Sequence, residues 1–219
     1  MSTTYQDKGS LEVETTGAAI EAAAGLAVVV LAIVGLSGRD GGMLMAIAAI
    51  ILGIGLIAQG GAVSVEHSRL LHTASGGTVS TVELGGGLTA EVLAGIAVVI
   101  LGILGVIGLA PAILIAIVII VAGAAAIMAT GGQRRLHALK LQGMSAATQQ
   151  IGDAAIAGAI NAQLMIGTAA IVLGILSLAM PGPAGILTLV GLLILGASVA
   201  IAGGTIAGQA SSRLFFSRT

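Results

Sequence analysis

The chain has 219 residues, of which 57% are hydrophobic and only 8% are charged, and its formal net charge is -1. A soluble domain carries about 25% charged residues, so this composition excludes a soluble globular protein and indicates an integral membrane protein. The small net charge argues against nucleic acid as a partner, and the absence of cysteine excludes disulfides and thiolate chemistry.

The first predicted unit is a membrane-crossing helical hairpin behind a polar tail. Residues 1–17 form this N-terminal tail, which lacks the basic start and the small-residue cleavage site of a signal peptide. The first span should therefore be retained as an anchor. Hairpin repeat 1 occupies residues 18–61 and turns at 37–42, where glycines and charged residues interrupt the apolar sequence. A cytoplasmic connector is predicted at 62–87.

The second unit, hairpin repeat 2, occupies residues 88–132 and turns near Pro111. Each arm holds roughly 20 mostly apolar residues, which is the length that crosses a hydrocarbon core of about 30 Å. The cytoplasmic connector at 133–159 is basic. From 152 to 162 small residues recur every four positions, which favours one long helix running into the fifth span.

The third unit, hairpin repeat 3, occupies residues 160–204 and turns at Pro181-Gly-Pro183. A proline cannot continue the helix that it follows, and glycine tolerates the backbone of a tight turn. Residues 205–219 form a C-terminal tail.

The three hairpins are copies of one sequence pattern. Each copy has a polar residue four positions before a glycine: Glu21 and Gly25, Glu91 and Gly95, Gln163 and Gly167. Each copy is predicted to close at a glycine pair: 60/61, 131/132 and 203/204. Because polar landmarks coincide as well as apolar ones, the sequence predicts an all-α integral membrane bundle of six helices with pseudo-threefold symmetry.

The content of small and aromatic residues bears on how these helices pack. There are 35 glycines, typical of membrane helices that approach closely through small residues. Tryptophan is absent, and the only aromatic residues are Tyr5, Phe215 and Phe216, so the usual aromatic belt at the membrane interfaces is missing. Either other chains cover much of the lipid-facing surface, or Gly, Ser and Thr take over the interface.

The basic residues predict the orientation of the chain. Of the eight Lys and Arg residues, all but Arg39 lie on the side that holds both termini and the two long connectors. The positive-inside rule then places both termini in the cytoplasm and the three short turns outside.

The repeated unit resembles a known family. The second and third copies begin with a helix of the form Gly-x-Ala-x-x-x-Leu-Gly-Ile-Leu, which the first copy varies to end in Leu-Ala-Ile-Val. A short turn that often holds proline follows, and then a second helix such as the one with Leu-Ile-Leu-Gly196 and Gly203. In this the six spans resemble the HdeD-like short-repeat proteins, six-span proteins of the bacterial inner membrane. The resemblance implies a cytoplasmic (inner) membrane location and protection against acid stress. It implies no established catalytic activity, and it supplies no catalytic residues.

Glu21, Glu91 and Gln163 form a candidate polar ring. They stand at matched positions, predicted to lie in the opening turns of the odd-numbered spans, so the symmetry would bring them to one depth. In a functional interpretation they surround a central vestibule and bind a cation or exchange protons. In a structural interpretation each carboxylate faces the N-terminal helix dipole and headgroup water, an interaction worth about 0.3–1 kcal/mol.

The basic residues near the connectors and tails form a second candidate set, which could bind anionic lipid headgroups or could only set the topology during insertion. The set is Arg69, Arg134, Arg135, Lys140, Arg213 and Arg218. Three histidines, His67, His72 and His137, lie in different connectors without metal-ligand spacing and are interpreted as solvated surface residues. Gln59 and Thr130, just before the glycine pairs, are predicted to make interhelical hydrogen bonds, with substrate contact as the alternative.

Two functions from different classes fit this sequence. The first is a noncatalytic structural or accessory membrane protein, possessing no cofactor or metal, which acts through helix packing with itself or with a partner complex. The second is a proton or small-solute channel with Glu21 and Glu91 at its cytoplasmic mouth. The central axis discriminates between them, because a channel needs water there and a packing protein needs leucine and isoleucine.

Overall fold

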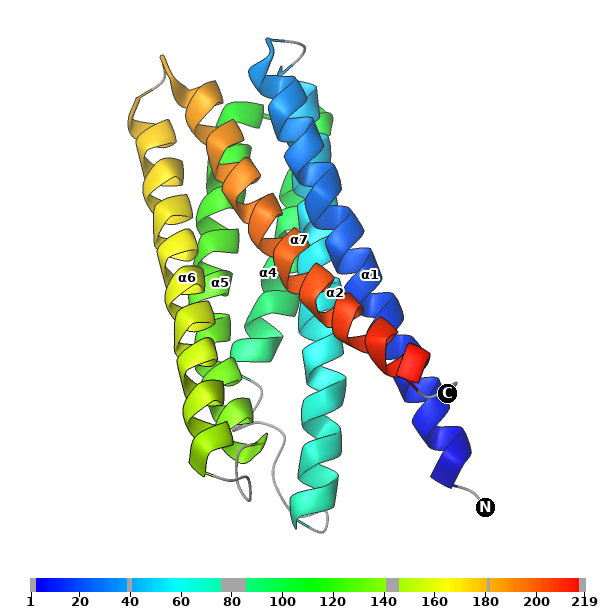
Figure 1. Ribbon diagram of the computed structural model, residues 1–219. Coiled ribbons are helices and arrows are strands. Elements are labelled where there is room, and N and C mark those ends of the chain that lie inside the picture. Colours follow the sequence, from blue (N-terminus) through cyan, green and yellow to red (C-terminus); the bar gives the residue numbers. More distant parts are fainter. Residues whose placement is uncertain (1–2, 39–40, 76–85, 141–145, 181, 217–219) are drawn as a thin grey trace.

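The computed structural model describes residues 3–38, 41–75, 86–140, 146–180 and 182–216, and describes side chains over 16–38, 41–61, 90–130, 157–180 and 182–204. Throughout the described ranges the regular structure is α-helical, without strands. The six helices are α1 (Thr3–Leu36), α2 (Gly41–Ser75), α4 (Gly86–Val106), α5 (Pro111–Lys140), α6 (Ala146–Ala179) and α7 (Ala184–Phe216). They form an elongated bundle in which α1 begins and α7 ends at the same end (Figure 1).

Five helical segments are long and apolar enough to cross a membrane: Thr16–Leu36, Gly41–Gly61, Pro111–Thr130, Ala157–Ala179 and Ala184–Gly204. The described apolar part of α4, Ala90–Val106, is shorter. Large apolar side chains, including Leu26, Leu93 and Ile201, are exposed on the outside of the bundle. Extensive apolar surface of this kind marks a membrane or a protein partner as the surroundings. The protein is therefore a multi-pass membrane protein.

The helices extend beyond the predicted spans. Because α1 begins at Thr3, the polar segment that was expected to be a tail is helical. The second spans end at or next to the predicted glycine pairs, as Gly41–Gly61, Pro111–Thr130 and Ala184–Gly204, but the helices α2, α5 and α7 continue beyond them to Ser75, Lys140 and Phe216. Glycine in a helix costs only about 1 kcal/mol relative to alanine, so a pair of glycines does not end a helix that is supported on both sides.

The long fifth helix and the short turns between paired helices are present as the sequence predicts. The fifth helix begins at Ala146 and runs without a break into its span. Gly38 and Gly108, in the first two turns, adopt φ angles of +88° and +90°, which glycine allows without strain. In the third turn the carbonyl of Pro183 accepts backbone N–H groups from Ile186 and Leu187, which starts α7.

The helices that follow each turn form the centre of the bundle. There α2, α5 and α7 contact one another, whereas α1 packs on α7 and α2, α4 packs on α2 and α5, and α6 packs on α5 and α7. The most extensive contacts join helices of different hairpins: α2 with α4, α1 with α7, and α5 with α6. Only 22% of the α6 span is buried, against 50% of the α5 span, so α6 is the most peripheral helix with a full-length span.

Each of these three contacts between hairpins contains a pair of glycines. Where α2 crosses α4, a methyl group on Gly53 would lie 2.7 Å from the carbonyl oxygen of Gly95, and a methyl group on Gly95 would lie 2.8 Å from that of Gly53. The same reciprocal contacts join Gly123 with Gly167, at 2.7 Å in both directions, and Gly25 with Gly196, at 2.6 and 3.1 Å. These distances leave no room for side chains, so the helix backbones are in direct contact.

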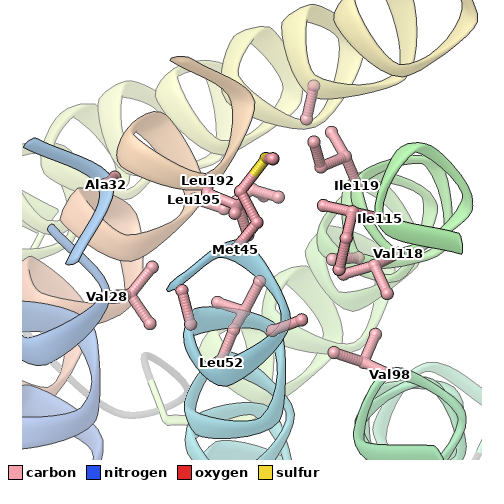
Figure 2. Close-up of a cluster of buried hydrophobic side chains, with 14 of the residues drawn as sticks. Val28, Ala32, Met45, Leu52, Val98, Ile115, Val118, Ile119, Leu192 and Leu195 are labelled. Carbon is pink, nitrogen blue, oxygen red and sulfur yellow. The ribbon is translucent and has the colours of Figure 1, made fainter. Parts of the chain in front are cut away.

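Apolar side chains fill the space between α2, α5 and α7. Leu52 of α2, Ile115 and Ile119 of α5 and Leu192 of α7 are fully buried and belong to one cluster of buried residues. Figure 2 shows these side chains approaching one another from the three helices, with Val28 and Val98 at the sides. The centre of the bundle is thus occupied by leucine, isoleucine and valine.

Candidate functional site

Two carboxyl groups are buried in this apolar bundle. Glu21 of α1 is 1% exposed and Glu91 of α4 is 2% exposed. They are the only charged residues in the part of the chain whose side chains the structure describes. Charged residues are almost never fully buried unless they are paired, so these two positions are the strongest candidates for a function.

Small residues on the neighbouring helices allow this burial. A methyl group on Gly60 of α2 would lie 3.1 Å from Cβ of Glu91, so α2 lies directly against α4 at this residue. On the other side, Gly203 of α7 approaches the backbone of Ala18 and Ala22, the residues that flank Glu21 on α1. Close backbone contact therefore excludes solvent around both glutamates.

The carboxyl groups are not satisfied by the surrounding protein. Oε1 of Glu21 and Oε1 of Glu91 are buried and have no hydrogen-bond partner among the described residues. Burying an unpaired carboxylate is expensive, and no side chain that the structure describes supplies a positive charge to offset it.

The three members of the predicted polar ring lie in different surroundings. Gln163 of α6 is only half-buried, whereas Glu21 and Glu91 are buried. Glu21 and Gln163 lie near the start of the spans Thr16–Leu36 and Ala157–Ala179 but not at helix N-termini, because α1 begins at Thr3 and α6 at Ala146. The helix dipole acts only within the first turn, and buried carboxyl groups do not face headgroup water. The structural interpretation therefore does not account for Glu21.

Among the described side chains the other buried polar residues are Gln59, Thr130, Ser177 and Thr188, and Ser177 donates across the third turn to the carbonyl of Ala184. The hydroxyl of Thr130 donates to the carbonyl of Ile127 at 2.6 Å, within its own helix, so the predicted interhelical bond of Thr130 is wrong. Gln59 is buried, as expected for a residue in a helix contact. Sequence reasoning missed Thr188, whose buried hydroxyl lies 3.0 Å from the carbonyl oxygen of Ala184. A threonine in the otherwise apolar stretch 184–197 was the only available signal.

The basic candidates and the histidines fall outside the side chains that the structure describes. This applies to Arg69, Arg134, Arg135, Lys140 and Arg213, to His67, His72 and His137, and to Arg218, which lies beyond the described helices. Within the described residues no group of three or more His, Cys, Asp or Glu side chains could hold a metal ion.

The fold and the buried carboxyl pair together define a multi-pass, all-α membrane protein with an apolar centre. Comparison with protein-family models, with curated proteins and with solved structures finds no match to this chain. The resemblance to the HdeD-like proteins stays a prediction that rests on the helix patterns.

Proposed function

We propose that the chain is a noncatalytic structural or accessory membrane protein that acts by packing against copies of itself or against a partner complex. The observation that carries this proposal is the closed apolar centre, where α2, α5 and α7 contact one another through fully buried side chains such as Leu52 and Leu192. Such a centre suits a rigid packing unit, since protein interiors of this kind have few voids.

Part of this proposal is that the bundle consists of three repeated hairpins about a pseudo-threefold axis. Support comes from the reciprocal glycine contacts, one in each of the three contacts between hairpins. Burial also repeats, because positions 21–30 and 91–100 carry the same sequence of buried and exposed residues, as do positions 41–50 and 111–120. The glycine contacts favour an alignment of Thr130 with Gly60 rather than with Gln59, since Gly53 and Gly123 are the matched crossing residues.

The proton or small-solute channel is the weaker candidate. A conducting path along the central axis would need a row of polar groups or water there, whereas the described core cluster consists of Leu, Ile, Val, Ala and Met side chains, with the hydroxyl of Thr188 beside Met45. The buried carboxyl pair is the one feature that favours the channel, and it lies on the outer helices α1 and α4.

Self-association is proposed to use the peripheral helix α6. Its outer face carries small and polar residues, Ala157, Gly158, Asn161 and Ala162, all of them exposed. A methyl group on Gly158 would meet nothing within 4 Å in the chain itself. Small residues that let backbones approach, with polar side chains that hydrogen-bond across helices, are the usual means of association in membranes.

The cytoplasmic-membrane location, the cytoplasmic termini and the acid-stress role are proposed only on the basic-residue bias and the family resemblance.

The test is the oligomeric state of the full chain in several mild detergents and in nanodiscs, measured by mass-resolved light scattering. We expect an oligomer that Gly158→Leu dissociates, because the new side chain would separate the two copies. Gly204→Leu is the matched control, since Gly204 also has open space around it and lies on α7. A monodisperse monomer of the unmodified chain in every condition would refute self-association, and an oligomer that survives Gly158→Leu would remove α6 from the interface.

A further inference from the structure

Helix α5 continues in one piece out of its apolar span and carries two adjacent arginines just beyond it. The span Pro111–Thr130 ends four residues before Arg134 and five before Arg135. Because a helix rises about 1.5 Å per residue, the backbone of the two arginines lies about 6 and 7.5 Å beyond the end of the span. The headgroup layer on each side of a hydrocarbon core is about 5–7.5 Å thick. The pair therefore lies at the depth of lipid phosphate groups.

The exposed side of α5 leads to these arginines. Met128 is 56% exposed and is the one exposed residue of α5 between positions 114 and 130. It lies within the apolar span, where an exposed residue meets lipid or another membrane protein. Residues seven apart, which are two turns of a helix, lie on the same face, so Arg135 continues the face of Met128. Arg135 thus belongs to the membrane-facing side of α5 at the headgroup level.

The helix ends on the side of the chain termini differ in charge. Beyond their spans, α5 and α6 together carry three Lys and Arg residues and one acidic residue, Asp153. There α1 and α7 together carry two Lys and Arg residues against three acidic ones, and α2 carries one of each. The paired helices α5 and α6 therefore have the one net basic end among the described helices, and a single carboxylate cannot neutralise both arginines.

The arginine pair is not needed to orient the chain. Each hairpin already has one basic residue eight to ten residues beyond its second span, namely Arg69, Lys140 and Arg213. These three satisfy the positive-inside rule. The glycine crossings align Arg134 and Arg135 with positions 64–65 of the first hairpin and 207–208 of the third, which are uncharged. An additional pair that occurs in one hairpin alone points to a ligand rather than to topology.

We propose that Arg134 and Arg135 of α5 bind the phosphate of an anionic phospholipid, such as phosphatidylglycerol, in the leaflet on the side of the chain termini. The planar guanidinium group of arginine donates two parallel hydrogen bonds to a phosphate, which suits it to this ligand. A zwitterionic lipid has the same phosphate, but its choline group cancels the charge. The site goes beyond the packing function and does not rest on it.

Native mass spectrometry of the full chain from mild detergent tests this site. Phosphatidylglycerol and phosphatidylcholine are titrated in parallel, and the dissociation constant of the first bound lipid is measured for each. We expect phosphatidylglycerol to bind about 25-fold more tightly, because each arginine next to an anionic headgroup contributes about fivefold in affinity. R134Q and R135Q should each lower this preference about fivefold, and the double variant should abolish it.

R213Q is the matched control, since it removes one arginine of α7 whose backbone lies about 13.5 Å beyond the span Ala184–Gly204, outside the headgroup layer. It should leave the preference unchanged. R134K/R135K keeps both charges and should keep most of the preference, which separates loss of charge from loss of packing. Inorganic phosphate, added as a competitor, should not displace the lipid. Circular dichroism checks that every variant keeps its helices, and the single variants decide if the double variant does not fold.

Equal binding of the two lipids by the unmodified chain would overturn the proposal, and so would an unchanged preference in folded variants at residues 134 and 135. A loss in R213Q as large as in R134Q would refute a site on α5, because it would indicate a diffuse surface charge. Displacement by inorganic phosphate would refute the lipid as ligand. Each of these results leaves the packing function standing, because the oligomeric state is measured separately by light scattering.

Discussion

Gly203 and Gly204 are adjacent on α7 but have different surroundings, which makes them a test of the glycine contacts. A methyl group on Gly203 would lie 2.6 Å from the carbonyl oxygen of Ala18 and 3.0 Å from Cα of Ala22 on α1, whereas one on Gly204 would meet nothing within 4 Å. Gly203→Ala should therefore destabilise the bundle, and Gly204→Ala should not.

The magnitude follows from the geometry. Carbon–oxygen contacts between helices normally lie at about 3.3–3.6 Å, so the new methyl group at residue 203 is too close by about 0.7–1 Å. Overpacking costs about 1–3 kcal/mol, and the upper end applies because the opposing atoms are backbone atoms that cannot rotate away. Replacing glycine by alanine also stabilises the helix itself by about 1 kcal/mol. This gain is shared by both variants, so they should differ by about 3 kcal/mol, roughly a hundredfold in the folding equilibrium.

The assay is unfolding in mixed micelles with increasing SDS, followed by far-ultraviolet circular dichroism. Intrinsic tryptophan fluorescence is not an option because the chain has no tryptophan. The free energies of unfolding of the two variants are compared with that of the unmodified chain. Equal stability of Gly203→Ala and Gly204→Ala would refute the claim that backbone contact at residue 203 holds α7 against α1.

Two further predictions use the same assay. Leu52→Ala should lower the free energy of unfolding by about 2 kcal/mol or more, because Leu52 is fully buried and its removal leaves a cavity and lost contacts even where lipid replaces water. Ile54→Ala on the same helix is the control and should cost much less, because Ile54 is 46% exposed. Equal losses would place Leu52 outside the core. Thr188→Val should change the free energy of unfolding by at most about 1 kcal/mol, because the Thr188 hydroxyl donates to carbonyls of its own helix. A loss well above this would mean that the 3.0 Å contact with Sδ of Met45 matters more than these bonds.

The existence of the helices could be predicted from sequence, but their ends could not. Long apolar runs between Gly- and Pro-containing turns identify the helices on both sides of residues 37–42, Pro111 and Pro183. Where a helix ends in water depends on small differences in free energy, and a glycine pair shifts this balance by only about 2 kcal/mol. Three helices therefore pass through the glycine pairs that mark the predicted ends of their membrane spans.

The partner of each helix was also beyond sequence reasoning. Hairpin connectivity suggests that α1 packs mainly on α2, yet its most extensive contact is with α7, the last helix in the chain. The crossing glycines lie in both partners, but nothing in the sequence says that Gly25 meets Gly196 rather than Gly53. For the same reason the burial of Glu21 was not predicted, since it depends on α7 lying against residues 18 and 22.

The spacing of the glutamates and the crossing glycines links the packing to the candidate site. Residues four apart lie on the same face of a helix, so Glu21 and Glu91 share a face with Gly25 and Gly95. The glycine brings the neighbouring backbone into direct contact one turn away, and this contact excludes water from the carboxyl group. A larger residue at the glycine position would separate the helices and let water solvate the carboxylate. The close approach of the helices is therefore what keeps each carboxyl group out of water.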